Sequence, residues 1–138
     1  MATNSKQLTV GNRDEQLVAN LFRKYHFWCH IMAKDASGSQ PVDLICLRRN
    51  EGWLVDVKNV RSQEMSFPFR RIEPNQLTCM DYASNWAGIT NLGFAICFER
   101  DDLRPLFLSY SKYMEMSGKG EKSVKMTDLD PLEELLWE

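Results

Sequence analysis

Two short apolar segments, 41–47 and 53–58, most constrain how this chain can fold, because each carries an acidic residue in an otherwise strand-like pattern. The five residues between them, Arg-Arg-Asn-Glu-Gly, are polar and end in glycine, which is typical of a hairpin loop. We therefore expect two antiparallel strands that bring Asp43 opposite Asp56. Because a buried carboxylate is costly without a partner such as a metal ion, this pair predicts a functional site.

The second acidic segment predicts which side chains share a face of the sheet. Side chains alternate along a strand, so Asp56 and Lys58 are expected to point the same way, whereas Trp53, Val55 and Val57 point the other. Two carboxylates on neighbouring strands offer oxygen ligands alone, which suit a hard ion such as Mg²⁺. The alternative is an Asp56–Lys58 ion pair on the solvated face of an antiparallel sheet.

The order of expected elements, helix, three strands, helix and two strands, predicts a mixed α/β (α+β) fold with a central mixed β-sheet flanked by helices. The length of 138 residues and the hydrophobic content of 43% suit a single domain, 1–138. Residues 117–138 combine a polar turn with a short amphipathic helix at 128–137, which we expect to cover the sheet or a partner subunit. The helices are expected at 12–25 and 74–86, and the strands at 27–31, 41–47, 53–58, 93–98 and 105–109.

Several motifs resemble those of known nucleases. Pro41-Val42-Asp43 and Asp56-Val57-Lys58 resemble the motif of the PD-(D/E)XK nuclease superfamily, with one extra residue between the proline and the first aspartate. The strings GNRDEQLV at 11–18 and ASGS at 36–39 look like the archaeal Holliday junction resolvases. The strings SFPF at 66–69 and NQL at 75–77 look like the RecU-type resolvases of Gram-positive bacteria. Together these matches cover roughly residues 9–113.

The resemblance implies a restriction-endonuclease-like fold and a divalent-metal-dependent DNA endonuclease, most specifically a Holliday junction resolvase that acts as a homodimer on four-way or other branched DNA. The ion would be Mg²⁺, with Mn²⁺ as a substitute. Lys58 would be the catalytic lysine and Gln76 an accessory polar group. One departure is that only residues 25–40 stand where RecU-type proteins carry a long stalk. The residues implied as catalytic are Glu15, Asp43, Asp56, Lys58 and Gln76, and those implied at the metal are Glu15, Asp43, Asp56 and Val57.

Some of these residues also have a purely structural explanation. Asn12 and Glu15 are spaced as a capping box, so Glu15 could close the N-terminus of the first helix. Gln76 lies early in the second helix, where a solvated surface glutamine is common. Ser37 and Ser39 fit ordinary loop composition.

The formal net charge of −2 is unevenly distributed along the chain. Residues 1–71 carry 11 Lys+Arg against 7 Asp+Glu, whereas residues 72–138 carry 6 against 12. The basic half is the one that holds the candidate site, so phosphate contacts are expected there, although a solvated surface position is the alternative for any single arginine. The candidate DNA-binding residues are Arg13, Lys34, Ser37, Ser39, Arg48, Arg49, Arg61, Arg70 and Arg71.

The remaining features favour a cytoplasmic protein. No apolar run approaches the roughly 20 residues that cross a bilayer, and the first ten residues are mostly polar, unlike a signal peptide. The four cysteines form no C-x-x-C pair and are expected to be buried free thiols. Two other functions remain open: a homing, restriction-type or repair nuclease that acts on duplex DNA, and a non-catalytic DNA-binding module with the same fold.

Overall fold

The computed structural model describes residues 2–33, 40–61, 63–100 and 104–137, with side chains from residue 13 onward. None of the helices in this part of the chain is long and apolar enough to cross a membrane. The main elements, in chain order, are α1 (Ala2–Lys24), β1 (Trp28–Ile31), β2 (Leu44–Arg48), β3 (Glu51–Val60), β4 (Ser66–Pro68), η1 (Phe69–Arg71), α2 (Pro74–Trp86), β5 (Asn91–Phe98), β6 (Leu106–Ser109), α3 (Tyr110–Gly118), β7 (Ser123–Lys125), η2 (Met126–Asp128), β8 (Asp130–Pro131) and α4 (Leu132–Leu136).

The central sheet has six strands in the order β1-β2-β3-β5-β6-β8. Strands β3 and β5 are parallel and every other neighbouring pair in this sheet is antiparallel, so the predicted mixed sheet is confirmed. The expected hairpin joins β2 to β3, and Leu44 is the register partner of Val55. Helix α2 supplies the crossover between the parallel strands β3 and β5, as the element order required.

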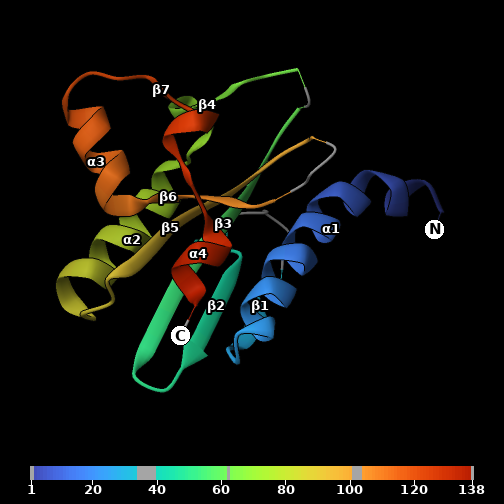
Figure 1. Cartoon of the computed structure of the whole chain (residues 1–138), viewed down its shortest axis with the longest axis horizontal. Coiled ribbons are helices and arrows are strands. Elements are labelled where there is room, and N and C mark those ends of the chain that lie inside the picture. Colours follow the sequence, from blue (N-terminus) through green and yellow to red (C-terminus); the bar gives the residue numbers. More distant parts are fainter. Residues whose placement is uncertain (1, 34–39, 62, 101–103, 138) are drawn as a thin grey trace.

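Helices cover both faces of the sheet (Figure 1). On the face that we call the α1 face, Val18 and Phe22 of α1 pack with Trp53 and Val55 of β3 in one buried cluster. Leu136 of α4 belongs to the same cluster. The C-terminal helix therefore covers the sheet of its own chain, and Leu136 is buried rather than available to a partner.

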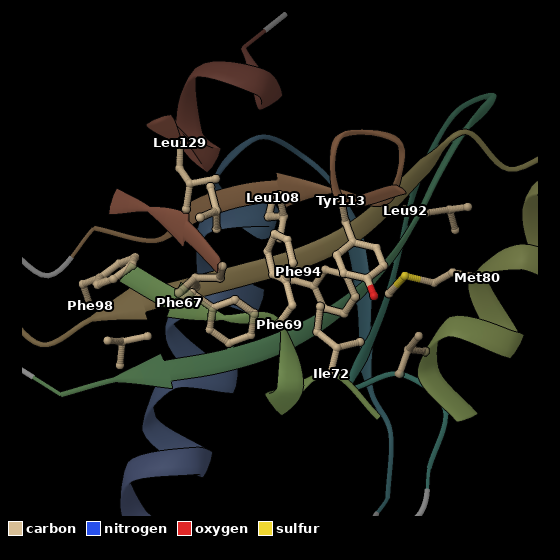
Figure 2. Close-up of a cluster of buried hydrophobic side chains, with 14 of the residues drawn as sticks. Phe67, Phe69, Ile72, Met80, Leu92, Phe94, Phe98, Leu108, Tyr113 and Leu129 are labelled. Atoms are coloured by element: carbon tan, nitrogen blue, oxygen red, sulfur yellow. The ribbon is translucent and has the colours of Figure 1, made fainter. Parts of the chain in front are cut away.

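The opposite face, which we call the α2 face, is covered by α2, α3 and the small two-stranded sheet of β4 and β7. Figure 2 shows Phe94 of β5 near the centre of this cluster, with Tyr113 of α3 beside it and Met80 of α2 beyond Tyr113. The rings of Phe94 and Tyr113 meet edge to face with their centroids 6.2 Å apart. Phe67 on β4 extends the cluster toward the end of β3.

Three expectations about the elements were wrong or incomplete. Helix α1 begins at Ala2 instead of near residue 12, so Asn12 lies inside the helix and the proposed N-terminal capping box does not exist. Helix α3 directly follows β6 and was not predicted, and the C-terminal helix is only five residues long, Leu132–Leu136. The stretch 59–71, for which no helix or strand was expected, contains the end of β3 together with β4 and η1.

Candidate active site

Asp43 is held directly against β3 at its middle. It lies one residue before β2, is 6% exposed, and its Oδ2 accepts a hydrogen bond of 2.8 Å from the backbone N–H of Val57. Its Oδ1 accepts a second hydrogen bond, of 3.2 Å, from Nε2 of Gln40. The Asp43 carboxylate thus accepts from β3 where a backbone carbonyl of a neighbouring strand would otherwise do so. This hydrogen bond fixes the Asp43 carboxylate beside Asp56.

Asp56 lies on β3 and is only 2% exposed. Its Oδ2 is 3.0 Å from Nζ of Lys58, at ion-pair distance, but this atom accepts no hydrogen bond of acceptable geometry. Burial raises the pKa of Asp56 to about 7, the nearby charge of Asp43 adds to that rise, and Lys58 opposes it. The alternative of a solvated surface ion pair is therefore wrong, because on the α2 face the side chain of Asp56 is 3% exposed and that of Lys58 is 12% exposed.

Lys58 is held by three groups at once. Besides its pairing with Asp56, its Nζ donates to the backbone carbonyl of Arg71 and to Oε1 of Gln76, each at 3.2 Å. Gln76 is 6% exposed, and its Oε1 also accepts a hydrogen bond of 3.0 Å from the backbone N–H of Glu73, the N-cap residue of α2. A capping box therefore fixes the glutamine that orients the lysine. Gln76 is thus buried beside Lys58 and is not a solvated surface residue.

Glu15 lies on the buried side of α1. It is 6% exposed and comes three, four and seven residues before Val18, Ala19 and Phe22, so it belongs to the stripe of the helix that packs on the sheet. Within the described part of the chain, no group of three or more His, Cys, Asp or Glu side chains is arranged to hold a metal ion. The structure thus brings Asp43, Asp56, Lys58 and Gln76 together, and it buries Glu15 without placing it in such a group.

A second polar cluster lies on the α1 face at the end of β3. Nδ2 of Asn59 donates to Oδ2 of Asp14 at 2.7 Å and to Oε1 of Glu99 at 2.8 Å. Arg13 donates to Oδ1 of Asp14 through Nε and Nη2, at 3.1 and 3.0 Å, and also pairs with Glu99. We call these four residues the Asn59 clamp. The guanidinium of Arg13, a candidate DNA contact, is thus occupied by two carboxylates of its own chain.

The remaining candidate DNA-binding arginines fall into two groups. Arg48 donates to Glu51 and to two backbone carbonyls, and it lies with Arg49 at the β2–β3 turn. Seven strand residues at ~3.4 Å each separate that turn from Lys58, a distance of about 24 Å. Arg61, Arg70 and Arg71 instead are exposed around the other end of β3, next to the Lys58 site. Lys34, Ser37 and Ser39 lie outside the described residues.

Four residues that make polar contacts at the site or at the end of β3 were not predicted from the sequence. The side chain of Gln40 donates a hydrogen bond to Asp43, and the backbone N–H of Glu73 donates one to Gln76. No sequence motif specifies these hydrogen bonds. Asn59 follows the Asp56-Val57-Lys58 motif directly, and a polar side chain on the face where Val55 and Val57 are apolar was the available signal. Glu99 carried no signal in the sequence, because its partner Asn59 is 40 residues away.

The fold resembles that of a solved nuclease. The 1.6 Å structure of Archaeoglobus fulgidus Hjc, a Holliday junction resolvase from an archaeal hyperthermophile, matches this structure with a TM-score of 0.60. The match covers 91% of this chain and 98% of that one, at 13% sequence identity. No family model and no curated protein matches the sequence. The likeness establishes that this chain has a resolvase-type fold, as predicted, and at this identity it establishes the fold alone.

The donor set of the site fits a divalent cation. Asp43 and Asp56 offer carboxylate oxygens on neighbouring segments, and Oδ2 of Asp56 is a buried polar atom without a hydrogen bond. A cation beside it would satisfy that atom and would favour the charged form of both acids. Two carboxylates suffice for Mg²⁺, which usually keeps several waters and takes further oxygens from a substrate phosphate.

Proposed function

We propose that this chain is a divalent-metal-dependent DNA endonuclease, and more specifically a structure-selective Holliday junction resolvase. The observation that carries the proposal is the buried Asp43–Asp56–Lys58 group, with Asp56 lacking a hydrogen bond to Oδ2 and Lys58 oriented by Gln76. A purely structural ion pair has no need of a second carboxylate against it, which costs free energy through like-charge repulsion and desolvation. The resolvase-type fold supports the same conclusion.

The residues take separate roles in this proposal. Asp43 and Asp56 would hold Mg²⁺ or Mn²⁺, and the remaining candidate ligands would be Glu15 on α1 and the peptide group of Val57 on β3. When bound, the ion supplies positive charge to the scissile phosphate and lowers the pKa of a water molecule. Lys58 is an ammonium donor whose direction is fixed by Gln76 and by the Arg71 carbonyl, so it can stabilise the negative charge that develops on the phosphate.

The DNA backbone would follow the exposed arginines near the end of β3. Three exposed arginines lie where the chain leaves the sheet beside Lys58: Arg61, Arg70 and Arg71. A DNA strand whose phosphate reaches the site would pass close to them. Arg48 and Arg49 lie at the far end of β3, and we leave them out of this surface.

Symmetric cleavage of a junction needs two sites related by a two-fold axis, so we propose a homodimer. Several large apolar side chains are exposed and available for such an interface, among them Trp86 at 78%, Trp28 at 60% and Trp137 at 58%. Light scattering of the free protein and of its junction complex tests this part: a chain that stays monomeric in both states does not support the resolvase.

The central experiment is a cleavage assay with a four-way junction, linear duplex and single-stranded DNA. We expect Mg²⁺ or Mn²⁺ to support cleavage of the junction, and Ca²⁺ to support binding with little turnover because its coordination is looser. Lys58→Ala should bind DNA and fail to cleave it, whereas Lys112→Ala, which removes a lysine on α3, should cleave normally. Full activity in excess chelator would remove the metal from the proposal. Equal cleavage of duplex and junction would favour a duplex nuclease.

A further inference from the structure

We propose that Asn59 is a positioning residue for the candidate site, because it fixes helix α1 and the end of β3 relative to each other. The inference rests on the proposed function, because it concerns the binding of a cation by Asp43 and Asp56. Asn59 would affect that binding without contacting the cation or these two residues. Asn59 lies next to Lys58 in sequence but on the opposite face of the sheet, where it touches α1 and not the site.

The Asn59 clamp is a closed set of directional contacts. One amide group donates to two carboxylates from different elements, Asp14 on α1 and Glu99 just after β5, and Arg13 joins the same two carboxylates from the other side. Asp14 is 1% exposed, whereas the side chains of Arg13 and Glu99 are 43% and 30% exposed, so the clamp is buried at Asp14 and open to water at Glu99. Hydrogen bonds from Asn59 and Arg13 lower the pKa of Glu99, which keeps it charged as the clamp requires. The clamp thus joins α1, β3 and the end of β5 at one point.

The backbone of Asn59 makes the matching contact on the other face. Its carbonyl accepts a hydrogen bond of 2.6 Å from Nη1 of Arg71, whose own carbonyl accepts from Nζ of Lys58. Arg71 also lies over the ring of Phe67, which is fully buried. One residue therefore connects the α1 helix, through its side chain, to the turn that orients the lysine, through its backbone.

This connection matters because the apolar part of the α1 interface constrains the helix less closely than the polar contacts at its two ends. Val18, Ala19 and Phe22 pack by apolar contacts, which are non-directional and permit small sliding or rotation of the helix. Hydrogen bonds constrain distance and angle much more closely. Because Glu15 directly follows Asp14 on α1, a clamp that fixes this part of the helix also limits where the Glu15 carboxylate can lie.

Helix α1 has a second polar tether, which provides a matched control. At its other end, Glu133 of α4 accepts hydrogen bonds from Nζ of Lys24 at 2.8 Å and from the hydroxyl of Tyr25 at 2.6 Å. Glu133→Gln therefore weakens the attachment of the same helix about three turns away from Glu15. If the Asn59 clamp only stabilised the fold, the two ends of α1 would be equivalent for the site.

The test measures Mn²⁺ binding to the DNA-free protein by electron paramagnetic resonance, and counts as site binding the part that Asp43→Asn removes. Asn59→Leu, which keeps the size of the side chain and removes both donors, should weaken that binding at least five-fold. Glu133→Gln should leave it within two-fold of wild type. Thermal unfolding identifies the temperature at which all variants are folded. If Asn59→Leu does not fold, Glu99→Gln removes one charge of the clamp with less disruption and should show the same weakening.

The outcomes separate the inference from the proposed function. Equal Mn²⁺ affinity in wild type and Asn59→Leu overturns the positioning role and leaves the proposed function standing. Equal weakening by Asn59→Leu and Glu133→Gln also overturns it, because the effect then follows stability. Wild-type protein without any Mn²⁺ binding that Asp43→Asn removes overturns the metal-dependent function and this inference with it.

Discussion

The two faces of β3 each bury an aspartate, and the two aspartates are satisfied to very different degrees. Asp14, which packs on the α1 face, accepts from Arg13 and Asn59 on both carboxylate oxygens. Asp56, on the α2 face, has a second carboxylate beside it and one oxygen without a hydrogen bond. Burial of a charged group is stable only when its partners are complete. Asp14 therefore stabilises the fold through complete hydrogen bonding, whereas Asp56 has an oxygen that could still accept a ligand.

The largest effect should come from removing the charge of Asp56. Asp56→Asn keeps the shape of the side chain but offers a weaker cation ligand, so we expect cleavage to fall by a factor on the order of 1,000, about 4 kcal/mol of transition-state stabilisation. DNA binding and folding should be retained. Asp81→Asn, an exposed aspartate on α2, is the matched control and should cleave normally. Single-turnover cleavage of the junction provides the measurement, and activity above a few per cent would remove Asp56 from the mechanism.

The second prediction concerns stability and pH without metal. The pKa of Asp56 is raised from 3.8 to about 7, so between about pH 4 and pH 7 the folded state holds a proton that the unfolded chain has released. The unfolding free energy must therefore fall as pH rises through this range, by about 1.4 kcal/mol per pH unit at most. Denaturant unfolding in chelator should show wild type losing about 3 kcal/mol between pH 5 and pH 8 relative to Asp56→Asn. Parallel pH profiles for the two proteins would contradict the raised pKa.

The third prediction concerns Asp14, the buried aspartate that accepts hydrogen bonds on both carboxylate oxygens. In Asp14→Asn, an amide NH₂ can replace the carboxylate oxygen that accepts from Asn59, so that two donors face each other. The substitution also removes the negative charge that pairs with Arg13. We expect a loss of about 2 kcal/mol in unfolding free energy, in contrast to Asp56→Asn, which should stabilise the metal-free protein at pH 8. Equilibrium unfolding of both variants under one condition decides the matter, and a change of the same sign in both would remove the distinction between the two sites.

The same comparison shows what the sequence could and could not predict. Strand periodicity placed Asp56 and Lys58 on one face and the hairpin brought Asp43 to them, because both features depend on local spacing. Gln76 was implied at the site only by the resemblance, and its local sequence favoured a solvated surface position, because its burial depends on the packing of α2 over the end of β3. In the Asn59 clamp, Asn59 is 45 positions from Asp14 and 40 positions from Glu99, and such contacts can be predicted only when the sheet order is known.

Charged residues were the least predictable from sequence, since composition does not say which arginines are already occupied. Arg13 and Arg48 both lie in the basic half of the chain, yet each is bonded to carboxylates of its own fold. Arg70 is exposed and has no such role among the described contacts. The distinction between an occupied and an available arginine therefore depends on tertiary structure.

The smallest effect should distinguish the two ends of β3 in DNA binding. Arg70 lies on η1 beside the candidate site, whereas Arg49 lies at the β2–β3 turn, and both are exposed. Removing one phosphate contact should weaken DNA binding several-fold and lower the salt dependence of the affinity by about one unit of slope. We expect this for Arg70→Ala and a change of less than two-fold for Arg49→Ala. Junction binding in Ca²⁺ across a series of salt concentrations measures both quantities, and an equal loss for the two variants would mean that the DNA follows the whole length of β3 instead of the end that carries Lys58.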